Sequence, residues 1–213
     1  MIELTDSTNK LDSISLQTLH QKLHDIVETL QAIIISHAPS SQELMHARIH
    51  LEHTAPLLQK DIEVILVCQE DMRTLNLESM GKDYATDVLS FPLAPLDMPK
   101  QDPTSLDHKA SATSAITTAP QIPESKKSPQ PPPIPLGSIV INLPLATSIS
   151  DEHAHSLCDE LCLLFLHGLL HLLGFDHESD NGEQRALESM LLSALALPSS
   201  LIDRTLMPPI STQ

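Results

Sequence analysis

The chain has 213 residues, 41% of them hydrophobic, and its 28 acidic and 12 basic side chains give a formal net charge of −16. This length and apolar content are enough for one core, and the acidic balance excludes a protein that binds nucleic acid through a broad basic surface. The three cysteines, the lack of a basic and apolar leader, and the lack of any bilayer-length apolar run predict a cytoplasmic protein that binds no membrane.

The first part of the chain alternates strand and helix patterns. Apolar residues recur at helical spacing after Ser15, its expected cap, and a nearly continuous β-branched run follows near residue 62. Pro92 stops a later run of strand character. The expected elements are a strand at 1–5, a helix at 15–36, a strand at 62–68, a helix at 69–80 and a strand at 86–91.

The composition changes between residues 94 and 135. This stretch is dense in proline, serine, threonine, alanine and lysine, and it ends in a proline-rich run. Such a segment buries too little apolar surface to offset the entropy of ordering it. We therefore predict a disordered insertion with polyproline character at 94–135, inside a single domain that spans residues 1–213.

Strand character returns at 136–142, and two helices are expected after it. The first begins after Ser148 or Ser150 and runs to Leu173, and the second covers residues 182–197 and stops before Pro198. The elements together give a small sheet of three or four strands packed with helices, which is an α+β fold.

Three histidines lie at the end of the longer helix. Four residues of helix advance about 400° and about 6 Å, so His167 and His171 project from one face, one turn apart. Gly174 is the residue type that ends a helix in the left-handed conformation, so the chain can turn and bring His177 to the same ion. Three neutral imidazoles with a fourth position left for water form the ligand set of a catalytic zinc site, which predicts one Zn2+ per chain.

The same spacing matches the metzincin peptidases, which carry a glutamate directly after the first histidine as general base. Here that position is Gly168, so a peptidase would lack its base and this alternative ranks below other metal chemistry. A second tract with helical spacing, His46, His50 and His53, has no glycine to return the chain and few apolar neighbours. We expect it to bind metal adventitiously or not at all.

Two blocks of sequence resemble the YbeY-type endoribonucleases, which act in bacterial ribosomal RNA maturation. Residues 167–177 read His-Gly-Leu-Leu-His-Leu-Leu-Gly-Phe-Asp-His, and residues 83–92 read Asp-Tyr-Ala-Thr-Asp-Val-Leu-Ser-Phe-Pro. The resemblance is close over about residues 61–93 and 136–204. It implies a mixed sheet of about four strands with about five helices, and a zincin-like three-histidine site at the end of a long helix.

The resemblance also implies an activity and partners. A protein of this family would be a zinc-dependent, single-strand-specific endoribonuclease acting in 16S rRNA 3′-end maturation and ribosome quality control, with His167, His171 and His177 as metal ligands. Its partners would be ribosomal RNA and the small ribosomal subunit, with ribosomal proteins or a ribosome-associated GTPase as further candidates.

One position departs from the family pattern. Where the family has arginine in an Arg-Gly-x-Asp segment, this chain has Met80, which cannot bind phosphate as a guanidinium does. Lys82 and Arg73 are the candidate substitutes for substrate binding, and Asp176 and Lys82 are the candidate catalytic residues. Asp176 could orient an imidazole or simply cap its own turn. The loss of the arginine motivates a further alternative, a zinc-bearing ribosome-assembly binding protein with weakened catalysis.

Overall fold

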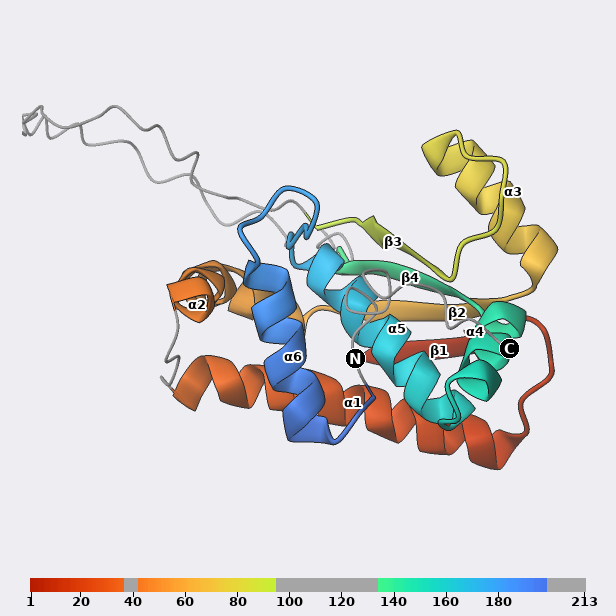
Figure 1. The fold of residues 1–213 in the computed structure, drawn as a ribbon, viewed down its shortest axis with the longest axis horizontal. Coiled ribbons are helices and arrows are strands. Elements are labelled where there is room, and N and C mark those ends of the chain that lie inside the picture. Colours follow the sequence, from red (N-terminus) through yellow and green to blue (C-terminus); the bar gives the residue numbers. More distant parts are fainter. Residues whose placement is uncertain (37–41, 95–133, 199–213) are drawn as a thin grey trace, which may run out of the picture. The chain divides into compact units, whose positions relative to one another are not determined.

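A computed structural model of the chain describes residues 1–36, 42–94 and 134–198 (Figure 1). All of them belong to one structural unit. The predicted insertion at 94–135 lies outside the described residues except at its two ends, so its disorder and the single-domain organisation stay predictions.

The fold is built on one mixed sheet of four strands, as the sequence predicts. The strand order is β1 (Ile2–Asp6), β2 (Ile62–Val67), β4 (Gly137–Asn142) and β3 (Val88–Pro92). The first three strands run parallel, and β3 pairs antiparallel with β4 at one edge. In register, Ile62 lies opposite Gly137 and Val88 lies opposite Ile141.

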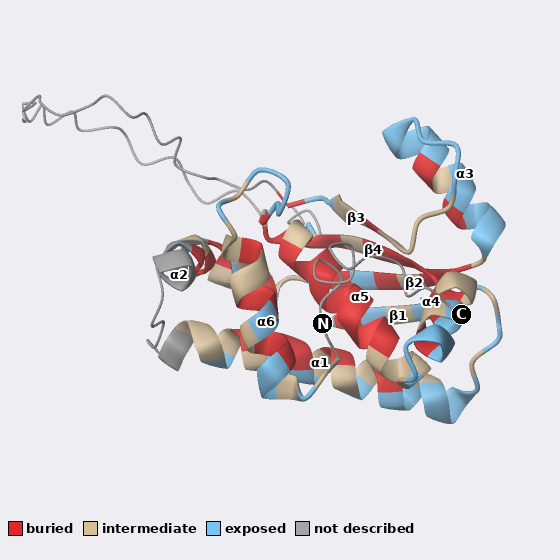
Figure 2. Cartoon of the chain, in the orientation of Figure 1, coloured by how far each residue is buried: buried red, intermediate tan, exposed pale blue. Residues whose placement is uncertain are grey.

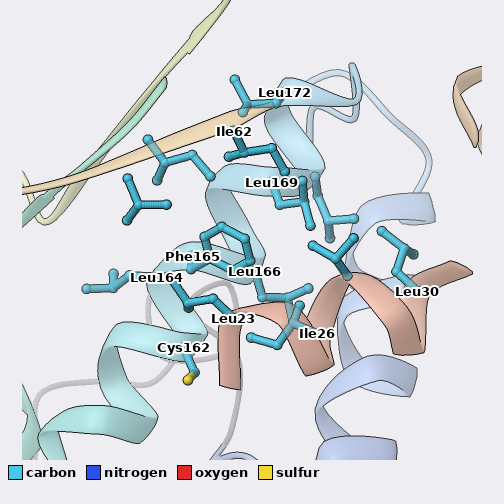
Figure 3. Packing of buried hydrophobic residues seen from close by; sticks show 14 of the residues in the cluster. Leu23, Ile26, Leu30, Ile62, Cys162, Leu164, Phe165, Leu166, Leu169 and Leu172 are labelled. Carbon is cyan, nitrogen blue, oxygen red and sulfur yellow. The ribbon is translucent and has the colours of Figure 1, made fainter. Parts of the chain in front are cut away.

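Helix α5 (Leu157–Leu172) packs between the sheet and a layer of other helices, and it is buried at almost every position from Glu160 to Leu172 (Figure 2). A helix covered on both sides has to be apolar all round, which explains its leucine content. In Figure 3, side chains of α5 such as Phe165 and Leu169 lie between Ile62 of β2 and the apolar face of α1 (Ser13–Ser36).

The remaining helices complete this layer and cover the opposite face of the sheet. Helix α6 (Glu183–Leu195) contacts α1, α2 (Gln42–Thr54) and α5, and a short 3-10 helix at Ala55–Gln59 leads into β2. Helix α3 (Gln69–Met80) covers a smaller apolar cluster on the other face of the sheet, and its outer side is exposed (Figure 2). With α4 (Leu143–Glu152), the described part of the chain contains six α-helices, against the about five that the resemblance implies.

The predicted long helix is wrong at its N-terminal half, because the chain forms two helices there. Helix α4 covers Leu143–Glu152, and the helical conformation is interrupted at Ala154, whose φ is +55°. Helix α5 then begins after Ser156, whose side chain accepts a hydrogen bond from the Asp159 N–H at 3.1 Å. Ser156 therefore caps α5. Ser148 and Ser150 lie inside α4, so neither of them caps the helix that carries the histidines.

The first long helix also begins earlier than expected. Helix α1 starts at Ser13, and the side chain of Asp12 accepts a hydrogen bond from the Ser15 N–H at 2.7 Å. Asp12 therefore caps the helix, and Ser15 lies inside its first turn.

Candidate metal centre

Helix α5 places two histidines on one face at its C-terminal end. The Nε2 atoms of His167 and His171 lie 3.1 Å apart, and the ring centroids are separated by 4.7 Å. Side chains one turn apart on a helix are expected to meet in this way.

A glycine turn at the end of α5 delivers the third histidine. Gly174 has a φ of +86°, and its N–H and that of the following residue bind carbonyls of the last helical turn. This is a Schellman motif, the helix ending that the glycine predicts. The ring centroid of His177 then lies 5.3 Å from that of His167 and 5.5 Å from that of His171.

The donor set fits a tetrahedral metal ion. The ligand nitrogens of the three histidines all lie within 4.8 Å of one another, whereas tetrahedral zinc with Zn–N bonds of about 2.1 Å needs a separation of roughly 3.4 Å. Small side-chain rotations therefore bring all three into ligating distance. Within the described ranges, no other group of three His, Cys, Asp or Glu side chains has this arrangement.

Burial prepares one of the ligands for metal binding. Burial and the neighbouring imidazoles of His167 and His177 lower the pKa of His171 to about 4. The charged form of His171 is disfavoured mainly by lost hydration and also by the two adjacent imidazoles. His171 is thus neutral near pH 7, which is the form that binds a metal ion.

Helix α6 supplies the groups that orient two of these histidines. Glu188 is fully buried, and its Oε1 lies 3.4 Å from Nδ1 of His167. An Nδ1–H that donates to this carboxylate leaves the Nε2 lone pair free for the metal. Gln184, also fully buried, accepts a hydrogen bond from the backbone N–H of His177 at 3.0 Å.

Sequence reasoning missed both of these polar residues, although a signal for them exists. Gln184 and Glu188 are four residues apart and share a buried helix face with Leu187 and Leu191. Polar side chains at core positions of an amphipathic helix need a partner, and here the partners are parts of the histidine site. Among the described residues, Glu188 Oε2 and Gln184 Nε2 have no hydrogen-bond partner, so the pair is only partly satisfied.

Asp176 lies at the mouth of the site and binds within its own turn. Its carboxylate accepts hydrogen bonds from the Ser179 hydroxyl at 2.7 Å and from the Glu178 N–H at 3.1 Å. The bond from Ser179 is the main cause that lowers the pKa of Asp176. Of the two roles expected for Asp176, the structure places it in the turn-capping one, and any catalytic role stays a prediction.

The histidines open into a cleft of about 650 Å³. Strand β3 and the segment before it form one side, and the 174–178 turn contributes to the other. Met80 and Lys82 both line this cleft, so the segment that departs from the family pattern does lie beside the three histidines.

Arg73, the other candidate substitute, is not among the residues that line the cleft. Its guanidinium binds Asp83 through two contacts, Nε to Oδ1 at 2.7 Å and Nη2 to Oδ2 at 3.0 Å. Arg73 also lowers the pKa of the Asp83 carboxyl through these bonds. Lys82 thus lines the same cleft as the three histidines, whereas Arg73 is paired with Asp83.

The rival histidine tract has a structural role where it is described. His50 donates from Nε2 to the Leu173 carbonyl at 2.6 Å, and its ring packs against Phe175 with centroids 4.4 Å apart. His53 binds the Ile49 carbonyl of its own helix at 2.7 Å. The side chain of His46 lies outside the described residues.

A helix that carries two histidines, a turn that adds a third, and a mixed sheet behind them define a zincin-like arrangement, the class of fold and site that the sequence predicts. The family model of Endoribonuclease YbeY matches residues 7–195. The chain therefore belongs to the YbeY endoribonuclease family.

Curated relatives agree with this assignment. The chain is 42% identical over 158 residues to an Endoribonuclease YbeY of Helicobacter pylori (strain Shi470), which covers 73% of this chain and 88% of that protein. It is 44% identical over 148 residues to an Endoribonuclease YbeY of Nautilia profundicola, covering 70% and 81%. Among solved structures, the solution structure of TM1509 from Thermotoga maritima covers all of both chains at 19% identity and a TM-score of 0.44.

None of the described helices is long and apolar enough to cross a bilayer.

Proposed function

We propose that this protein is a zinc-dependent endoribonuclease that cuts single-stranded RNA. The observation that carries the proposal is a set of three adjacent imidazoles that line a cleft of about 650 Å³. Family membership supplies the class of reaction. When bound, zinc in such a set supplies a hydroxide-like nucleophile near neutral pH and polarises a phosphoryl oxygen.

The chain's own residues have distinct tasks in this reaction. His167, His171 and His177 hold the ion, and Glu188 keeps the His167 ring in the tautomer that leaves Nε2 free. Lys82 lies in the cleft, where its ammonium group can bind a substrate phosphate as a point charge.

The biological substrate follows from the family. We infer ribosomal RNA of the small subunit, with the 16S 3′ end as the site of maturation and a further role in ribosome quality control. Ribosomal proteins or a ribosome-associated GTPase would bring the enzyme to its substrate, and the compartment would be the cytoplasm. Recruitment by such partners fits the net charge of −16, because an acidic protein has little general electrostatic attraction for RNA.

The peptidase alternative is weakened by the packing around Gly168. A Cβ at this position would lie 2.9 Å from Cγ2 of Ile139 and 3.0 Å from Oγ of Ser90. These atoms belong to β4 and β3, so the position after His167 faces the sheet and has no room for a glutamate base. The binding-protein alternative is favoured by Met80, which leaves the cleft without the family arginine.

A cleavage assay tests the proposal. Purified full chain should cut single-stranded RNA, lose activity with a chelator, regain it with zinc and leave denatured casein intact. His171→Ala should remove both metal and activity, while the matched surface change His24→Ala on α1 should remove neither. Binding of RNA without cleavage by zinc-loaded protein would favour the assembly-factor alternative, and cleavage of casein alone would overturn the proposal.

A further inference from the structure

The segment between α3 and β3 is held by hydrogen bonds at both ends. Near its start, Arg73 binds the Asp83 carboxylate through two nitrogens, and the Asn76 amide donates to the Tyr84 carbonyl at 2.8 Å. Asn76 is itself buried, so this second contact is shielded from water. The Tyr84 carbonyl is therefore held by a buried side chain, and the preceding residue is held through its carboxylate.

The end of the segment is anchored by one buried residue. Asn142 donates from Nδ2 to the Thr86 carbonyl at 3.0 Å, and its backbone N–H donates to the Asp87 carbonyl at 2.8 Å. Asn142 is fully buried at the end of β4. The rest of the segment thus has little freedom, and the position of residue 84 is set before any ligand arrives.

An aromatic ring stands exposed on this fixed backbone. Tyr84 is the single tyrosine in the chain, its exposed fraction is 55%, and it lines the same cleft as the three histidines. Met80 lines this cleft too and is 54% exposed. The cleft therefore presents two large apolar side chains to solvent, next to a site that acts on a polar substrate.

The charges of the cleft make this apolar surface important. Among the described lining residues, Lys82 is the one lysine or arginine, whereas three carry carboxyl groups: Asp87, Asp176 and Glu178. Contacts to phosphate alone are too few to hold a flexible single strand here. Aromatic side chains bind unpaired bases by stacking, which needs no charge and is available only when the base has left its own helix.

We propose that Tyr84 is a nucleobase-stacking subsite, with Met80 as its apolar flank, that seats an unpaired base of the RNA strand beside the metal centre. The inference rests on the proposed endoribonuclease function and adds the group that selects single-stranded substrate. In this chain the apolar pair takes over part of the binding that a phosphate-binding arginine gives elsewhere in the family. Binding should then depend weakly on salt, with a slope of log affinity on log salt between about −0.7 and −1.4 for one or two phosphates.

The test compares variants of the zinc-loaded full chain on a single-stranded oligonucleotide. Tyr84→Ala should weaken RNA binding and raise KM about 5- to 150-fold, the effect of losing one stacked base, and Tyr84→Phe should stay within about twofold of wild type. Leu77→Ala is the matched control, since Leu77 is 47% exposed on α3 but is not among the cleft residues. Zinc content and melting temperature should be unchanged in all three.

A second substrate makes the assignment specific to stacking. Oligonucleotides that lack one base near the cleavage point should bind wild type as weakly as the full oligonucleotide binds Tyr84→Ala, and the variant should show no further loss. If wild type cuts RNA and Tyr84→Ala binds and cuts equally well, the stacking subsite is refuted while the endoribonuclease stands. Equal damage from Tyr84→Phe and Tyr84→Ala would also refute it, because the hydroxyl would then be the binding group. If wild type neither binds nor cuts RNA, the proposed function itself fails.

Discussion

Replacing Glu188 should separate the orientation of the metal site from the stability of the fold. Its carboxylate is fully buried and lies 3.4 Å from Nδ1 of His167, opposite the nitrogen that would bind the ion. Loss of such an outer carboxylate typically lowers metal affinity 10- to 100-fold, or about 1.4 to 2.7 kcal/mol. Glu188→Gln keeps a hydrogen-bond acceptor, so its zinc affinity should fall about tenfold. Glu188→Ala removes the acceptor, so its zinc affinity should fall about a hundredfold.

The metal-free protein should respond differently. Glu188 Oε2 has no hydrogen-bond partner among the described residues, so the buried carboxylate is poorly compensated in the absence of metal. Removing its charge in Glu188→Gln should leave the unfolding free energy unchanged or raise it, because a half-satisfied buried charge costs more than a neutral amide of the same shape. Glu188→Gln should therefore lower zinc affinity without lowering the stability of the metal-free protein.

Two measurements on the same samples check this reasoning. Competition with a chromogenic chelator gives zinc affinity, and urea denaturation with excess chelator gives the stability of the metal-free protein. Glu28→Gln, an exposed change of equal charge on α1, is the control and should alter neither. Wild-type zinc affinity in both Glu188 variants would refute the orienting role, and a Glu188→Gln protein that loses metal-free stability would refute the energetic account.

Met80→Arg should raise the rate of RNA cleavage at least tenfold at constant zinc content, because a positioned guanidinium stabilises a phosphoryl transition state by about 2–4 kcal/mol. An unchanged rate would show that residue 80 does not reach the phosphate. Because the pKa of His171 is lowered from 6.5 to about 4, the unfolded chain takes up this proton first as pH falls. The unfolding free energy of the chelated protein should therefore fall by roughly 1 kcal/mol per pH unit as pH drops from 6.5 to about 4, after allowance for solvent screening. In His171→Asn, urea denaturation should show a weaker dependence of this free energy on pH. The N–H groups of Leu93 and Ala94 both bind the Leu136 carbonyl, so β3 and β4 meet as a hairpin without residues 95–133. Replacing that segment by a turn roughly tenfold shorter should stabilise the fold by about 2 kcal/mol, and a lower melting temperature would show that the segment makes stabilising contacts.

The amino-acid sequence by itself determined most elements and the approach of the three histidines. The sequence predicts helix α3 at its observed bounds, and strands β2 and β4 to within one residue, because runs rich in apolar β-branched residues and a helix with a capped end leave local patterns. The meeting of His167 and His171 follows from helix geometry alone. Gly174 takes the left-handed conformation, which ends the helix in a defined turn and so brings His177 close to the other two histidines.

Other features depended on the packing of distant segments. The pairing of Glu188 with His167 joins residues 21 positions apart in sequence, and it exists because α6 docks on α5 with that face inward. The sequence makes Arg73 a candidate for binding a substrate phosphate, whereas the turn after α3 places Asp83 within its reach. Spacing along one helix is fixed by its geometry, whereas the rotation and docking of two helices are fixed by the whole core. The meeting of the three histidines could therefore be predicted from the chain, and the groups that contact them required the tertiary structure.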